Sequence, residues 1–152
     1  KLLLNLNNPV NALSGLPLRQ QLLDRGYRRV AAALQTEALA LLQQAGISPA
    51  QLTPLPPQRV PAVLRLPTPL FRLVAARMLK IDDQARSSMA DDLALGRVTE
   101  IDALCGEVVR LAQAQGAEAP LNPKMVALVE QQPQRAAPYS AAALISALGL
   151  SA

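Results

Sequence analysis

Three polar side chains recur at helical spacing near the start of a leucine-rich segment. Lys1, Asn5 and Asn8 occupy positions i, i+4 and i+7, so on a helix they lie within roughly 60° of one another. Lysine brings a mobile cation, and asparagine brings both a hydrogen-bond donor and an acceptor. Such a strip suits a ligand-facing surface. It is also the pattern of an ordinary helix with one solvated face, and the pattern alone favours this second interpretation.

A second polar group follows in two neighbouring segments, residues 86–92 and 96–104. Each segment has hydroxyl side chains where a helix N-cap is expected, and carboxylates in the turn that follows. A carboxylate at a helix N-terminus is normally stabilised as the anion rather than prepared for proton transfer. Taken alone, these segments therefore indicate two well-capped helices.

The order and spacing of both groups resemble the C-terminal domain of the ketopantoate reductase (2-dehydropantoate 2-reductase) family. The stretches that carry the resemblance are Lys1-x-x-x-Asn5 with Asn8-Pro9, then Ser87-Ser88-Met89 with Asp92, then Gly96-Arg97-x-Thr99-Glu100-Ile101-Asp102-x-Leu104, and finally Pro120-Leu121-Asn122. Together they cover nearly the whole chain. The stretch from the serines to Asp102 is specific, whereas the lysine helix alone is a weak signal.

The resemblance implies a role for each site residue. Lys1 would be the general acid that protonates the ketone oxygen of a 2-keto acid as hydride reaches its carbon. Asn5, Asn8 and Ser88 would bind the substrate by hydrogen bonds, with Ser88 at the carboxylate end. Glu100 would be the second catalytic residue, and its charge would favour the protonated form of Lys1.

Two departures from the family pattern affect this transfer of roles. The family usually places three residues between its two asparagines, whereas only Leu6 and Asn7 separate them here. Asn5 is therefore the firmer assignment of the two. Cys105 stands where the family commonly has asparagine, and we interpret it as a small buried apolar group rather than a reactive thiol. Both departures bear on substrate selectivity.

The resemblance also implies a fold and a cofactor. The expected fold is all-α, the multi-helical C-terminal domain of a two-domain NAD(P)-dependent dehydrogenase, similar to that of 6-phosphogluconate dehydrogenase. No G-x-G-x-x-G follows a predicted strand, so NADPH would bind mainly to a preceding Rossmann domain. We interpret residues 1–152 as one helical substrate-binding and catalytic domain, separated from that Rossmann domain. The apolar start without an N-cap favours a fragment, which we expect to be inactive alone.

The composition favours helices and excludes several kinds of chemistry. The chain is 51% hydrophobic but only 2% aromatic, and the prevalence of leucine and alanine suits helices better than strands. The absence of histidine excludes imidazole-based metal sites and a serine–histidine triad. A single cysteine excludes an intrachain disulfide.

The charge and hydropathy patterns bear on partners and location. The net charge of +4 comes from 15 basic and 11 acidic residues. The basic residues are dispersed, so we favour a solvated surface that attracts anionic substrates over nucleic-acid binding. No apolar run approaches the ~20 residues of a membrane span, and no signal peptide is evident. We expect a cytoplasmic protein whose partners are a small 2-keto acid and its own Rossmann domain. A homodimer is left open.

The helices that must position the site are predicted from caps and breakers, and we expect seven or eight of them with no strand. The first should end at Gly15, and the others should cover 17–24, 27–45, 68–80, 88–96, 99–116, 122–132 and 139–148. Seven prolines between residues 48 and 69 forbid a long helix there. They indicate a packed connection with short turns rather than a ligand for a proline-binding module.

Two alternative functions remain. One is a non-catalytic helical interaction or dimerisation module, which the leucine-rich helices would suit. Such a module has no need to gather Lys1, Asn5 and Asn8 with Ser88 and Glu100 in one cleft. The other is a reductase of the same fold with a different 2-keto or carbonyl substrate. The sequence does not separate that enzyme from one that reduces ketopantoate in pantothenate biosynthesis.

Overall fold

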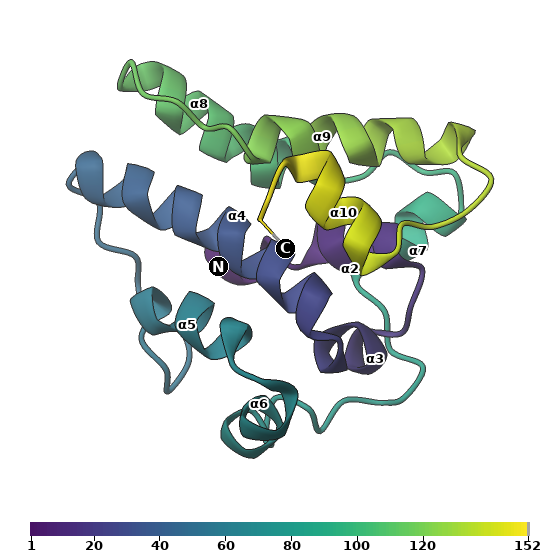
Figure 1. The fold of residues 1–152 in the computed structure, drawn as a ribbon. Helices are drawn as coiled ribbons and strands as arrows, with labels where there is room; N and C mark the ends of the chain where they lie inside the picture. Colours follow the sequence, from purple (N-terminus) through teal and green to yellow (C-terminus); the bar gives the residue numbers. More distant parts are fainter. Residues whose placement is uncertain (152) are drawn as a thin grey trace.

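Helix α4 (Arg25–Gln44) is the longest element and forms the centre of the fold. The computed structural model describes residues 1–151. Val30, Leu34, Ala38 and Leu41 of α4 are buried at successive 3–4 residue intervals, which gives the helix a continuous apolar face. Helices from both halves of the chain pack against α4 (Figure 1).

The described residues form ten α-helices and no strand, so the expected all-α fold is confirmed. The other helices are α1 (Leu2–Asn5), α2 (Asn8–Ser14), α3 (Leu18–Leu23), α5 (Val60–Arg65), α6 (Thr68–Val74), α7 (Ser88–Ala94), α8 (Glu107–Ala114), α9 (Asn122–Gln131) and α10 (Ala141–Leu148). Two 3-10 turns, η1 (Pro57–Arg59) and η3 (Gln132–Gln134), and one π-helical turn, η2 (Asp102–Gly106), complete the described elements. None of these helices is long and apolar enough to cross a bilayer.

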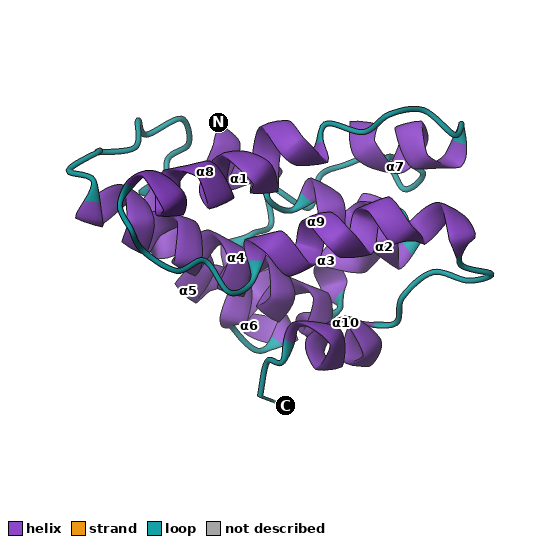
Figure 2. Cartoon of the chain, turned by 90° about the horizontal axis from the view of Figure 1, so that it is seen from above, coloured by secondary structure: helices purple, strands orange, loops and turns teal. Residues whose placement is uncertain are grey.

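The helices lie in layers on either side of α4. Figure 1 shows α8 and α9 along one side of α4, and α5 with α6 along the other. Helix α10 packs against both α4 and α9. Helix α2 packs against α7 and α9, and Figure 2 shows α7 at the edge of the molecule beyond α2. The contact between α2 and α7 therefore joins the start of the chain to its middle.

The first expected helix is broken in two, which corrects the prediction of one continuous helix up to Gly15. Helix α1 ends at Asn5 and α2 begins at Asn8. Pro9 accounts for the break, because proline lacks an amide proton and is tolerated only in the first turn of a helix. Gly15 ends α2 with a positive φ of 66°, as expected.

Helix α4 begins at Arg25 rather than at residue 27, so Gly26 does not break the chain as its position between the two predicted helices suggested. It lies in the first turn of α4, where the Asp24 carboxylate caps the helix by accepting a 2.7 Å hydrogen bond from the Gly26 amide. A Cβ atom at Gly26 would stand 2.7 Å from the Cβ of Ala141. Glycine therefore serves the close approach of α10 to α4 rather than a turn.

The predicted end of one further helix is also wrong. Helix α6 ends at Val74 rather than Lys80, and the Thr68 hydroxyl donates to the Leu23 carbonyl instead of capping α6. The Thr99 hydroxyl makes no capping hydrogen bond within the described residues, and the segment that follows begins with the π-helical turn η2. The apolar spacing of this segment predicts a core face of Ile101, Leu104, Val108 and Leu111; the first three are buried, and Leu111 is half-buried against the core. The proline-rich segment forms only η1 and the short α5, as predicted.

Candidate active site

The N-terminus of α7 is fastened to α2 by Ser87. Its hydroxyl accepts a hydrogen bond from the Ala90 amide at 3.2 Å, which is the expected N-cap. The same hydroxyl donates to the Asn8 carbonyl at 3.3 Å, and the Ser87 amide donates to Oδ1 of Asn11 at 2.9 Å. Helix α7 therefore begins at a fixed place beside α2.

Three of the predicted site residues meet at this place. Nδ2 of Asn8 donates to Oε1 of Glu100 at 3.3 Å, and the Ser88 hydroxyl donates to the same oxygen at 3.2 Å. Asn8 and Glu100 are 92 residues apart in the sequence, so only the fold brings them together. Ser88 and Glu100 are exposed and Asn8 is half-buried. A ligand approaching from solvent can therefore reach all three groups.

Glu100 retains hydrogen-bonding capacity in this arrangement. Both of its partners within the described residues bond to Oε1, and Oε2 accepts no hydrogen bond there. An ionised carboxylate has about four lone-pair positions. The cluster of Asn8, Ser88 and Glu100 can therefore accept hydrogen bonds from a ligand through Glu100, and donate to one through the amide and the hydroxyl.

Lys1 and Asn5 are not joined to this cluster. Lys1 is exposed ahead of α1, and its ammonium group forms no hydrogen bond or ion pair within residues 1–151. Asn5 is half-buried, and its side-chain amide is likewise unbonded among the described residues. Asn8 belongs to α2, whereas Lys1 and Asn5 belong to the segment of α1. The structure brings Asn8 into hydrogen-bonding contact with the cluster but neither Lys1 nor Asn5, and the roles assigned to these two residues stay predictions.

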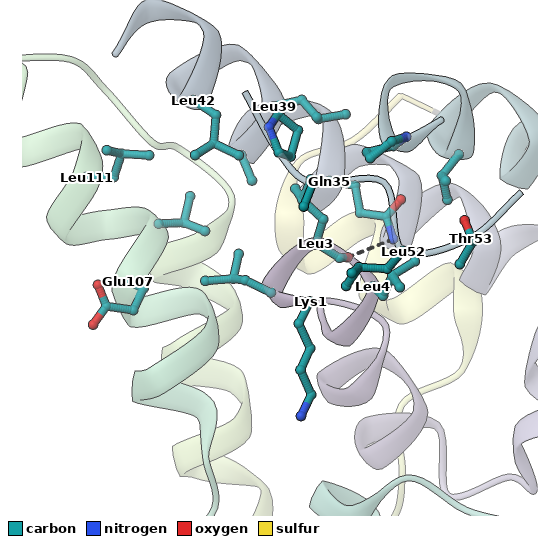
Figure 3. Close-up of a pocket in the computed structure, with 17 residues that line it drawn as sticks. Lys1, Leu3, Leu4, Gln35, Leu39, Leu42, Leu52, Thr53, Glu107 and Leu111 are labelled. Atoms are coloured by element: carbon teal, nitrogen blue, oxygen red, sulfur yellow. Dashed lines mark hydrogen bonds between the residues drawn. The ribbon is translucent and has the colours of Figure 1, made fainter. Parts of the chain in front are cut away.

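An apolar pocket of about 290 Å³ lies on another side of α1. Its wall comes from α1, α4, α8, residues 49–57 and the start of α5, and most of its lining side chains are leucine, valine or proline. Nε2 of Gln35 donates to the Leu3 carbonyl at 3.0 Å and ties α4 to α1. Figure 3 shows the Lys1 side chain at the edge of this pocket, extending away from it. The Lys1 ammonium group is therefore directed out of the apolar space.

Comparison with known families places the chain. The model of the family described as "Ketopantoate reductase PanE/ApbA C terminal" matches residues 1–132. The chain belongs to the ketopantoate reductase family. The matched range includes Lys1, Asn5, Asn8, Ser88 and Glu100, and it confirms the resemblance found in the sequence. No curated protein and no solved structure matches the chain.

Cys105 of this ketopantoate reductase domain is a core residue. It is fully buried, and burial together with the charge of Glu37 raises the pKa of its thiol to about 12. Thiolate is the nucleophilic form of cysteine, so this thiol is unreactive near neutral pH. The interpretation of Cys105 as a small apolar group is confirmed. The described residues also contain no group of three or more metal-ligating side chains.

The sequence analysis did not single out the buried amide side chains that lie next to the site. Asn11 and Gln21 are both fully buried. Gln21 exchanges two hydrogen bonds with Asn7, at 3.1 and 3.2 Å, where the chain passes from α1 to α2. A signal existed, because amide side chains within apolar helical segments must find partners when they are buried. Their partners lie in other elements and could not be named from the sequence.

Proposed function

We propose that this domain forms the substrate-binding and proton-donating side of an NADPH-dependent 2-keto acid reductase of the 2-dehydropantoate 2-reductase type. The observation that carries the proposal is the meeting of Asn8 and Ser88 at one oxygen of Glu100. These residues come from three separate segments within the range that matches the ketopantoate reductase family. In this proposal the full-length enzyme is cytoplasmic and supplies pantoate for pantothenate biosynthesis.

The cluster suits the polar groups of ketopantoate. A 2-keto acid presents carboxylate and ketone oxygens, which require hydrogen-bond donors, and ketopantoate also carries a hydroxyl group. The Ser88 hydroxyl has a single proton, which bonds to Glu100. Substrate binding would turn this proton towards the substrate carboxylate, while Glu100 accepts from the substrate hydroxyl. Asn5 and Asn8 would donate from their amides to the remaining oxygens.

Lys1 is the proton donor in this proposal. Its exposed ammonium group has no ion pair within the described residues, and a lysine side chain can turn towards a bound ketone. The ammonium group would polarise the carbonyl and transfer a proton to the oxygen as negative charge develops there. Glu100 would act beside it by holding the substrate within the cluster of Asn8, Ser88 and Glu100.

The described residues do not fit a dinucleotide by themselves. Residues 1–151 contain no strand, and therefore no strand–glycine turn–helix unit to hold a pyrophosphate. NADPH, when bound, supplies the hydride for the ketone carbon. We therefore assign its binding to a Rossmann domain of the full-length protein, facing the surface that carries Lys1 and Ser88. By the same reasoning we propose that the isolated domain has negligible turnover.

The experiment that tests this function is Lys1→Ala in the full-length protein, assayed with NADPH and ketopantoate. Loss of the general acid should lower kcat by roughly 10²–10⁴-fold, while the Kd for NADPH stays unchanged. Lys80→Ala removes another exposed lysine and serves as the control, with no expected change. Unchanged turnover in Lys1→Ala would contradict the assigned role.

The substrate itself is tested with the unmodified full-length protein. A panel of 2-keto acids should show the highest kcat/KM for ketopantoate. A higher value for another 2-keto or carbonyl compound would keep the fold and the chemistry but change the substrate. Absence of NADPH-dependent reduction across the panel would favour a non-catalytic helical module.

A further inference from the structure

Asn11 is a polar residue of α2 that lies in the interior of the domain. Its side chain is fully buried, in a helix where the neighbouring buried residues are mostly apolar. Burying an amide is unfavourable unless its donor and its acceptor both find partners. Asn11 satisfies both: Oδ1 accepts from the Ser87 amide at 2.9 Å, and Nδ2 donates to the Leu16 carbonyl at 3.0 Å.

The bond from Ser87 to Asn11 acts at the residue that precedes Ser88. The Ser87 amide is in the N-cap residue of α7, so it has no partner within that helix. Asn11 supplies the missing acceptor from the side of α2. Together with the bond from the Ser87 hydroxyl to the Asn8 carbonyl, this interaction fixes both the position and the direction in which α7 begins.

The same contact sets the distance between the two donors of the cluster. Asn8 lies one helical turn before Asn11 on α2, and Ser88 directly follows Ser87. A shift of Ser87 relative to α2 would therefore move Ser88 away from Asn8 and Glu100. Their hydrogen bonds, at 3.2 and 3.3 Å, are long enough that a small displacement would break them.

We propose that Asn11 is a positioning residue that holds Ser88 in place for substrate binding by accepting the hydrogen bond of the Ser87 amide. This inference rests on the proposed function for its effect on catalysis, and on the geometry alone for its effect on Ser87. Asn11 touches no substrate, because it is fully buried, and it acts only through α7.

The test compares Asn11→Leu with Asn122→Leu in the full-length protein. Both asparagines are fully buried, but Asn122 bonds to Glu37 at 2.8 Å, away from the cluster of Asn8, Ser88 and Glu100. Asn11→Leu should raise KM for the 2-keto acid by about tenfold, as expected from losing one hydrogen bond to a charged group, and leave KM for NADPH unchanged. Asn122→Leu should lower thermal stability without raising either KM. An equal rise in KM for both variants would overturn the proposal.

A double substitution shows whether Asn11 acts through Ser88. If it does, Asn11→Leu combined with Ser88→Ala should raise KM no further than Ser88→Ala alone. Multiplicative effects of the two substitutions on KM would overturn the proposal.

Asn11→Asp serves if the leucine variant does not fold, because aspartate keeps the acceptor for Ser87 and loses only the donor to Leu16. It should lower stability and leave KM unchanged, and a raised KM would count against the proposal.

Hydrogen exchange separates this inference from the proposed function. The Ser87 amide should exchange slowly in the unmodified protein and at least about tenfold faster in Asn11→Leu, whatever reaction the protein catalyses. Suppose that the Ser87 amide exchanges faster in Asn11→Leu, but that KM is unchanged in both Asn11→Leu and Ser88→Ala. The function assigned to Ser88 would then be refuted, while the contact between Asn11 and Ser87 would be supported. Unchanged exchange in Asn11→Leu would overturn the positioning role itself.

Discussion

The Arg28 guanidinium and the Glu100 carboxylate are both charged, yet this domain treats them in opposite ways. Arg28 is fully buried, and it donates to the carbonyls of Leu64 at 3.0 Å, Leu22 at 2.9 Å and Leu66 at 2.7 Å. Its guanidinium also stacks over the Phe71 ring at 4.1 Å. Glu100 is exposed and accepts two bonds at only one of its two oxygens.

The difference separates a structural polar group from one that is available to a ligand. The carbonyls that Arg28 satisfies lie at the C-terminal ends of α3 and α5, where helices leave acceptors without internal partners. Its donors are therefore occupied by the fold. Glu100 keeps one oxygen unbonded within the described residues, beside donors that can turn. A site can use such a group without dismantling the structure.

The largest expected effect is on stability, and it comes from the buried group. Arg28→Met keeps the length of the side chain but leaves three buried carbonyls without donors. At about 1 kcal/mol or more for each lost partner, the free energy of unfolding should fall by about 3–5 kcal/mol. Urea unfolding of the full-length protein measures this change.

The control for this prediction lies on the same helix. Arg25 is exposed and makes one bond to the Arg65 carbonyl. Arg25→Met should change the free energy of unfolding by less than about 0.5 kcal/mol. Similar losses in the two variants would remove the distinction between occupied and available polar groups in this domain.

The second effect falls on catalysis and tests the exposed side of the comparison. Glu100→Gln keeps one acceptor for Asn8 and Ser88 but removes the charge. Loss of a charged hydrogen bond to the substrate should lower kcat/KM about 10–100-fold, and the unfolding midpoint should stay unchanged because the side chain is exposed. Glu118→Gln, at another exposed carboxylate, is the matched control. A large loss of stability in Glu100→Gln would show that Glu100 is structural after all.

These two regions also differ in how far the sequence predicts them. The residues of the cluster were named from motif order, because local caps and a family pattern fall on Ser88 and Glu100. The role of Arg28 was not predicted, because its partners lie 6 to 38 residues away and are backbone carbonyls, which carry no residue identity. The break between α1 and α2, by contrast, has a local cause in the sequence, because Pro9 in the first turn of α2 has no amide proton to continue the hydrogen bonding of α1.

A smaller effect is expected at Glu37, which is half-buried and thus intermediate between the buried Arg28 and the exposed Glu100. Its carboxylate accepts the backbone amides of Leu121 at 2.8 Å and Asn122 at 2.9 Å, at the N-terminus of α9. Glu37→Gln would direct an amide donor towards one of these N–H groups. The free energy of unfolding should fall by about 1–2 kcal/mol, since a charged cap is lost. Urea unfolding measures the loss, and catalytic constants per folded molecule should not change. A fall in kcat/KM would connect this cap to the site.

The last effect is absent at neutral pH and concerns Cys105, whose charged form is disfavoured by burial. Its pKa in the folded protein is raised from an ordinary value of 9.0 to about 12, so the fold favours the protonated thiol. Above pH 9 the unfolded chain releases this proton while the folded protein keeps it. Stability is therefore full below pH 9, and it should fall by about 1.4 kcal/mol for each pH unit between about 9 and 12.

Cys105→Ala isolates this contribution. Burial also raises the pKa of Tyr27, but that tyrosine is present in both proteins and its effect cancels in the difference. At pH 7 to 8 the difference in unfolding free energy between the two proteins should be constant. Above pH 9 the free energy of unfolding of the unmodified protein should fall relative to that of Cys105→Ala by about 1.4 kcal/mol for each pH unit. Urea unfolding of both proteins across the pH range measures this change. A constant difference up to pH 11 would mean that the thiol ionises in the folded state. The core would then tolerate a negative charge at Cys105, as the exposed cluster does at Glu100. The contrast between the buried core and the exposed cluster would not hold at this position.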